Sequence, residues 1–190
     1  MCTLPLGLDR KFTTKEMNFK RVQENPIYCA MSRGKFENIV LQSISNVMFD
    51  LGKFASDLLL FTTKEFNFFT LPDSFKTGSS IMPQKKNYDI LELVRGNVNI
   101  FNGYQSQIEN VVKNLPAGYN RDFQLTKEPY MKGMKLAFDT IGVMNLVIKN
   151  LEAKKANLEN ACSSELYATD EALKLVKAGK NFREAYQEIK

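Results

Sequence analysis

The sequence predicts an all-α protein: three long helices packed lengthwise as a bundle, followed by a small C-terminal helical domain. Apolar residues recur at three- and four-residue steps over 34–61, 89–114 and 128–158, a pattern that predicts long helices. We find neither a strand-rich region nor an internal repeat. Hydrophobic residues make up 44% of the 190 and charged residues 25%, which are ordinary values for a globular chain with a core.

Residues 1–33 are predicted to be an irregular lead-in. Pro5, Gly7 and Pro26 interrupt any long period, and Thr13-Thr14-Lys15-Glu16 favours only a short helix. The bundle domain then covers 34–158 and includes a loop at 77–88.

The first two long helices follow from their apolar seams. One runs from about Gly34 to Phe61, with Gly52 as a weak point. The other runs from about Asp89 to Asn114, and Pro116 and Gly118 end it. Its seam is close to a heptad, which favours lengthwise packing. The seam positions of this second helix are Leu91, Val94, Val98, Phe101, Ile108 and Val112.

The third long helix is predicted from Glu128 to Leu158, with apolar residues on more than one side. Gly133 and Gly142 would let another helix approach closely. Between the first two helices, 62–77 carries no helical period, and its phenylalanines favour a packed connection such as a small hairpin.

Residues 159–190 are predicted to form the small C-terminal domain of two short helices. Thr169-Asp170-Glu171 starts one, and Asn181 with Glu184 three residues later fits a capping box for the other. Three long helices of this kind leave apolar faces uncovered. We therefore expect association with copies of the chain or with another segment.

Residues 78–87, Gly-Ser-Ser-Ile-Met-Pro-Gln-Lys-Lys-Asn, concentrate reactive groups in one short loop. Two hydroxyls, a proline, two cations and two amides suit a site that holds an anion and moves a proton. The 190 residues contain no histidine, the usual partner for such proton transfer. The loop is therefore predicted to be catalytic but to need groups from elsewhere.

Composition argues against several classes of function. The net charge of +5 is scattered, which disfavours nucleic-acid binding and favours small anionic substrates. Cys2, Cys29 and Cys162 are far apart and no histidine is present, so we expect no metal site. With no signal-peptide pattern and no apolar run of about 18 residues, we expect a cytoplasmic chain without a membrane span.

Two blocks resemble the argininosuccinate lyase branch of the fumarase/aspartase superfamily. The first is Gln84-Lys85-Lys86-Asn87 with the helix after it, and the second is Tyr119-Asn120-Arg121-Asp122, followed by Gln124 and Lys127-Glu128. Glu165 to Asp170 and Phe182 to Ala185 resemble the C-terminal small domain of that family.

The resemblance covers nearly the whole chain but only the C-terminal portion of the family. Full-length members are more than twice as long and carry Ser-Arg-Asn-Asp and Thr-His blocks upstream. We therefore expect a C-terminal fragment with three of the superfamily's central helices, inactive alone. Whether the upstream portion comes from another chain stays open.

The resemblance implies β-elimination of argininosuccinate to fumarate and arginine, a step of arginine biosynthesis, without a cofactor. It implies an active site shared between the subunits of a homo-oligomer. By its motifs, the catalytic residues are Ser79 as the base, Lys85 for the anionic intermediate and Glu92 as partner of a histidine from another subunit. The substrate-binding residues are Asn87, Tyr119, Gln124 and Lys127.

Other interpretations stay open. Glu92 could be a surface carboxylate paired with Lys85, Lys86 or Arg95, and Tyr119 and Gln124 could cap a helix connection. Arg33 could face the site, but its segment departs from the family pattern. The whole chain could be a non-catalytic truncated remnant or an oligomeric interaction protein.

Tyr88 departs from the signature, because the family usually has proline there. Tyrosine loses the preorganised helix start and adds bulk beside the loop, which is compatible with reduced selection on activity.

Overall fold

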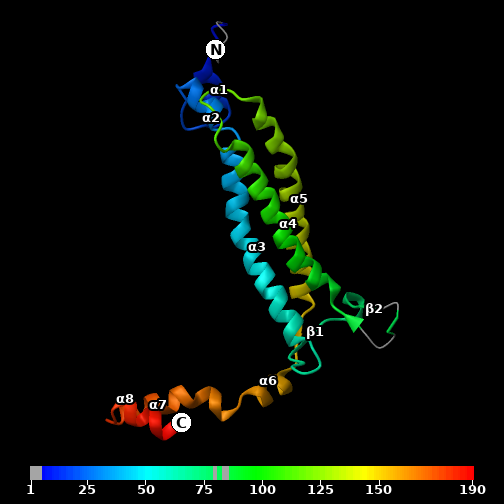
Figure 1. Cartoon of the computed structure of the whole chain (residues 1–190), viewed down its shortest axis with the longest axis vertical. Coiled ribbons are helices and arrows are strands. Elements are labelled where there is room, and N and C mark those ends of the chain that lie inside the picture. The colour runs from blue at the N-terminus through cyan, green and yellow to red at the C-terminus, as the bar shows by residue number, and fades with distance from the viewer. Residues whose placement is uncertain (1–5, 79–80, 83–85) are drawn as a thin grey trace.

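The computed structural model describes residues 6–78, 81–82 and 86–190. Three long antiparallel helices form the body: α3 (Lys35–Phe61), α4 (Asp89–Val112) and α5 (Lys127–Lys149). Figure 1 shows α3 descending from the N-terminal end, α4 returning beside it and α5 descending again. The predicted all-α class and long-helix bundle are confirmed.

Short elements occupy the two ends of the bundle. At the upper end lie α1 (Arg10–Glu16) and α2 (Pro26–Met31), and the turns η2 (Arg121–Thr126) precede α5. Pro26 begins α2 rather than interrupting a helix, because the first helical position needs no N–H donor. Asn25 caps α2 by accepting from the N–H groups of Ile27 and Tyr28.

The lower end carries two short antiparallel strand pairs. β1 (Phe69–Thr70) pairs with β4 (Glu152–Ala153), and β2 (Thr77–Gly78) pairs with β3 (Lys86–Asn87). The turn η1 (Asp73–Phe75) joins β1 to β2.

The predicted third helix, 128–158, is correct as far as Lys149 and wrong beyond it. It ends at Lys149 with Asn150 outside helical geometry, and β4 then pairs with β1. A separate helix, α6 (Lys155–Ala161), follows. A pairing partner more than eighty residues away in sequence therefore overrides the local apolar pattern, as Phe69 faces Ala153.

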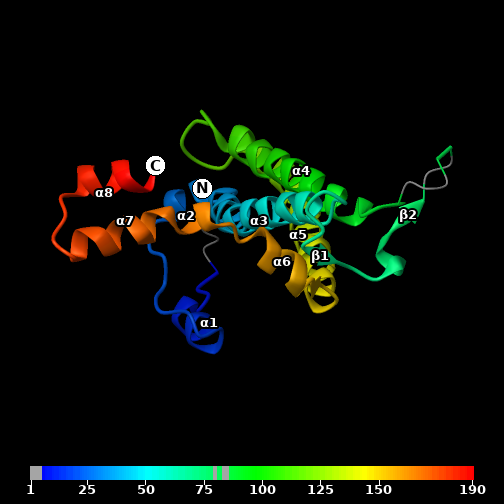
Figure 2. The same ribbon diagram turned by 90° about the horizontal axis from the view of Figure 1, so that it is seen from below.

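The C-terminal helices extend from the lower end of the bundle. They are η3 (Ser164–Tyr167), α7 (Ala168–Lys177) and α8 (Phe182–Ile189). Asn181 is the N-cap of α8, as predicted, but its side chain accepts from the Arg183 N–H at 2.8 Å rather than from that of Glu184. Figures 1 and 2 show these helices leaving the bundle on the side opposite the β2–β3 hairpin.

Two core clusters hold the bundle together. The first core cluster lies toward the hairpin and comprises Ala55, Leu58, Leu71, Tyr88, Leu91, Val94, Met144 and Val147. The second core cluster comprises Leu41, Met48, Val98, Phe101, Ile108 and Ala137. Gly52 is not a break: a Cβ there would lie 3.0 Å from Val98 Cγ2, so the glycine lets α4 approach α3.

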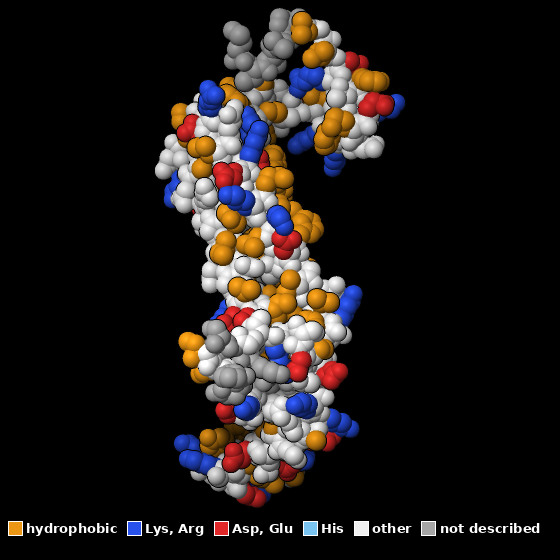
Figure 3. All heavy atoms as spheres, turned by 90° about the vertical axis from the view of Figure 1, so that its right-hand side faces the viewer, with side chains coloured by type: hydrophobic (Ala, Val, Ile, Leu, Met, Phe, Trp, Pro, Cys, Tyr) orange, Lys and Arg blue, Asp and Glu red, His pale blue; other side chains and the backbone are white. Residues whose placement is uncertain are grey.

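Large apolar side chains remain exposed along the bundle. Figure 3 shows hydrophobic side chains in scattered patches on the visible face. Phe138 on α5 is 70% exposed. Others are Phe36, Phe49, Leu93, Ile100, Met131 and Leu146. Among the described residues, no helix is long and apolar enough to cross a membrane.

Candidate active site

The β2–β3 hairpin places the base of the predicted catalytic loop at the lower end of the bundle. Thr77 faces Asn87, and Gly78 faces Lys86. Asn87 is therefore described, half-buried on β3. Ser79 and Lys85 lie outside the described residues, and their predicted roles stay predictions.

Tyr88 ties the hairpin to the chain that precedes it. Its side chain is only 8% exposed. The hydroxyl accepts from the Leu71 N–H at 3.1 Å and donates to the Leu71 carbonyl at 3.2 Å. Tyrosine at this position therefore has a packing and hydrogen-bonding role. Its presence does not by itself indicate reduced selection on activity.

The start of α4 carries the predicted Glu92. Asp89 and Glu92 lie in the first turn, where carboxylates are favoured by the helix dipole. Thr77 donates its hydroxyl to Asp89, a second tie between the hairpin and α4. Glu92 is exposed. It lies at the surface at the start of α4, and its role as the partner of a histidine stays a prediction.

Tyr119, Gln124 and Lys127 lie at the other end, in the connection between α4 and α5. Tyr119 is 57% exposed, and Gln124 and Lys127 are exposed as well. Gln124 lies in η2, and Lys127 begins α5 directly after it. Gln124 hydrogen-bonds the Tyr119 phenol on this open surface, and an amide and a phenol are groups that can bind a carboxylate.

Arg33 is brought against this group by the tertiary structure. Its guanidinium carbon lies 5.2 Å from the centre of the Tyr119 ring. Hydrogen bonding from Arg33, and then from Gln124, lowers the pKa of Tyr119 below its usual value. The four residues Arg33, Tyr119, Gln124 and Lys127 are called the tyrosine group below.

Gly34 explains why Arg33 comes so close. It is buried with φ of 76°, a left-handed conformation that favours glycine. A Cβ there would clash with Val112 Cγ1 and approach Thr126 Cγ2 to 3.2 Å. The glycine therefore seats the start of α3 against the end of α4 and η2, beside Tyr119. Gly34, directly before the long helical pattern, was the sequence signal that could have identified Arg33 as a candidate site residue.

The two predicted halves of the site lie far apart within one chain. The hairpin directly precedes α4, whereas Tyr119, Gln124 and Lys127 follow its other end, so the two groups lie at opposite ends of the bundle in Figure 1. The 24 residues of α4 separate them by about 36 Å at 1.5 Å per residue. One copy of the chain therefore does not bring its own predicted site residues together.

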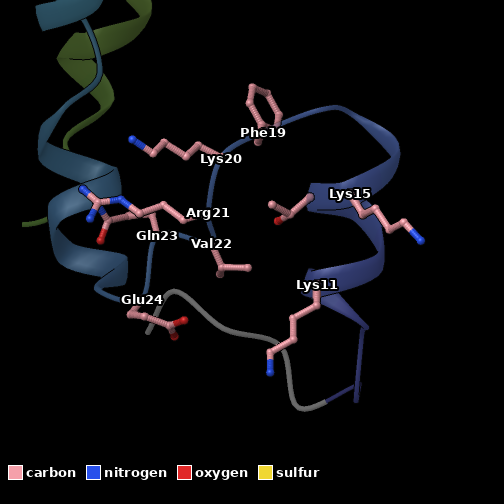
Figure 4. Close-up of a pocket in the computed structure, with 9 residues that line it drawn as sticks. Lys11, Lys15, Phe19, Lys20, Arg21, Val22, Gln23 and Glu24 are labelled. Carbon is pink, nitrogen blue, oxygen red and sulfur yellow. The ribbon is translucent and has the colours of Figure 1, made fainter.

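A hollow that none of these residues lines lies near the N-terminus. It has a volume of about 690 Å³ between α1 and the segment after it, and Lys11, Lys15, Lys20 and Arg21 are among its lining residues. In Figure 4 the side chains of Lys15 and Lys20 point in opposite directions, so the cations do not converge on one ligand. Within the described ranges, no group of His, Cys, Asp and Glu could hold a metal.

Comparisons with known proteins agree with this architecture. A family model described as "Lyase" matches residues 4–100. The argininosuccinate lyase of Thermotoga neapolitana is 39% identical over 186 residues, which are 98% of this chain and 47% of that protein. That of Xylella fastidiosa strain 9a5c is 41% identical over 182 residues, or 96% and 41%. The chain thus spans about half the length of these curated relatives.

Solved structures share the fold. An EDDS lyase in complex with formate is similar with a TM-score of 0.71 at 24% identity, over 98% of this chain and 37% of that one. A class II fumarase from Schistosoma mansoni is similar with a TM-score of 0.68 at 17% identity, over 94% and 43%. The family match over half of the chain shows that it belongs to the lyase family, with argininosuccinate lyases among its relatives.

Proposed function

We propose that the chain contributes part of the active site of an argininosuccinate lyase. The reaction would cleave argininosuccinate by β-elimination to fumarate and arginine, in the arginine biosynthesis of the cytoplasm. One observation carries the proposal: a chain about 40% identical to argininosuccinate lyases has one predicted polar group at each end of a bundle. No metal or cofactor is needed for this elimination.

The chemistry assigns complementary tasks to the two groups. Ser79 would take the proton from the carbon beside a carboxylate, and Lys85 and Asn87 would stabilise the negative charge that develops there. Glu92 would orient a histidine supplied from outside these 190 residues. The tyrosine group would bind the other carboxylates, with Arg33 adding a second cation to Lys127.

Geometry supports a site built from more than one copy. Because α4 separates the groups by about 36 Å, two antiparallel copies would place the hairpin of one beside the tyrosine group of the other. The exposed apolar residues of α3, α4 and α5 supply the surface that such a homo-oligomer would bury.

The test follows fumarate absorbance with argininosuccinate as substrate. The 190-residue chain alone should be silent, since it contains no histidine. Adding a polypeptide that carries the Ser-Arg-Asn-Asp and Thr-His blocks should restore turnover. Full activity of the chain alone would contradict the shared-site proposal, and continued silence of the mixture would favour a non-catalytic protein.

A pair of variants makes the rescue specific. Tyr119→Phe should lower the restored kcat/KM about 10-fold or more, because a hydrogen bond to the substrate is lost. Tyr186→Phe, on α8 and exposed, should leave it unchanged. Equal loss in both variants would argue against a site at Tyr119.

A further inference from the structure

We propose that Tyr88 is a positioning residue that fixes the base of the β2–β3 hairpin and thereby sets the place of Asn87. The inference deepens the proposed function and rests on it for the role of Asn87. Its structural part stands on contacts of the described residues alone.

The Tyr88 hydroxyl spans two chain segments. Tyr88 follows β3 directly, whereas Leu71 lies just before η1, on the other side of the hairpin. The hydroxyl bonds both the N–H and the carbonyl of Leu71, and Thr70 Oγ1 lies 3.5 Å away. Leu71 is only 2% exposed, so water cannot easily replace these bonds.

The ring is held as firmly as the hydroxyl. It belongs to the first core cluster together with Leu71, Leu91 and Met144. On its other side, Lys76 Nζ lies 5.4 Å from the ring centre. Lys76 is itself paired with Asp73 at 2.7 Å, which raises the pKa of the lysine. The segment that precedes β2, from Leu71 to Lys76, is thus packed against Tyr88, which follows β3.

The consequence falls on Asn87. Asn87 pairs with Thr77 across the hairpin. The Thr77 hydroxyl donates to Asp89, the residue directly after Tyr88. Asn87 is half-buried and directly precedes the buried Tyr88, so the anchored ring restrains the backbone position of Asn87. Proline at the start of α4 would fix φ but could not reach Leu71. Tyrosine therefore sets the position of Asn87 by a side-chain anchor.

Tyr88→Phe keeps the ring and removes the hydroxyl, so the helical bundle should remain folded. Hydrogen exchange followed by mass spectrometry should then show faster exchange at Leu71 and across Thr77 and Asn87. Tyr130→Phe is the matched control, because Tyr130 packs half-buried on α5 against the second core cluster. Unchanged exchange at the hairpin in Tyr88→Phe would overturn the inference.

Kinetics of the complemented enzyme separate positioning from simple stability. In Tyr88→Phe, the KM for argininosuccinate and the inhibition constant of fumarate should both rise about 10-fold, because a displaced carboxylate ligand weakens binding. A loss confined to kcat with unchanged KM would mean fewer active molecules and would overturn the positioning role. If the unsubstituted chain mixed with the added polypeptide has no activity, the proposed function is overturned instead. The hydrogen exchange of Tyr88→Phe would then decide whether Tyr88 fixes the hairpin.

Discussion

At the scale of single residues, Arg33 determines the electrostatics around Tyr119. Its guanidinium lies over the ring, and its hydrogen bonding is the largest cause of the lowered Tyr119 pKa. A cation at this distance stabilises the phenolate more than the phenol. The same cation would attract a substrate carboxylate, so one residue can orient the ring and supply charge.

Arg33→Gln should raise the pKa of Tyr119 toward its ordinary value. A lowered phenol pKa stabilises the folded protein only once the pH rises through that pKa. At neutral pH the variant should therefore have nearly the same free energy of unfolding as the unsubstituted chain. The measurement is an ultraviolet titration of tyrosine, with Tyr119→Phe subtracted to isolate the one phenol. Arg121→Gln is the control, because Arg121 is the smallest cause of the shift. An equal shift in both variants would contradict the role of Arg33.

At the scale of elements, Asn67 joins the C-terminal helices to the turn after α3. Its side chain accepts from Lys154 Nζ at 2.6 Å, and its carbonyl accepts from Asn157 Nδ2 at 2.7 Å. Its φ of 50° is left-handed, a conformation that asparagine tolerates better than most residues. The β1–β4 pair continues this connection directly beside Leu71, where Tyr88 binds.

Replacing Asn67 should loosen α6 while leaving the bundle folded. Asn67→Ala loses the bond to Lys154 and strains the left-handed backbone, whereas Asn67→Gly loses only the bond. Alanine should therefore cost about 1 kcal/mol more than glycine in the free energy of unfolding. Limited proteolysis should cut 150–163 faster in both variants. Identical unfolding midpoints for the two variants would contradict the strain at this residue.

At the scale of the whole molecule, the bundle is incomplete as a single copy. Its long helices bury two core clusters yet leave Phe138, Met131 and Leu93 mostly exposed. A surface of this kind is costly in water and is normally covered by another chain or segment. The separation of the hairpin from the tyrosine group points to the same need.

Phe138→Asp should weaken self-association, because it places a charge where an apolar contact is expected. Light scattering should show an oligomer for the unsubstituted chain and a smaller species for this variant, with helical content unchanged by circular dichroism. Lys135→Ala, on the exposed surface of the same helix, should keep the oligomer. A monomeric unsubstituted chain would contradict the prediction.

The long helices could be predicted because their apolar periods are local. The seam of α4, from Leu91 to Ile108, is buried as its spacing predicts. The end of α5 could not be predicted, because Leu151 continues the apolar pattern while β4 pairs with a distant strand. The motif residues were chosen by resemblance, and the structure places the described ones without testing their roles.

The sequence alone determined the helical class, the polar loop, the two family blocks and the lack of histidine, since each is a local or compositional property. Tertiary structure alone decided three things: that α4 holds the two blocks at opposite ends, that Gly34 seats Arg33 beside Tyr119, and that Tyr88 reaches back to Leu71. Each depends on contacts between segments distant in the chain, which no local period or motif encodes.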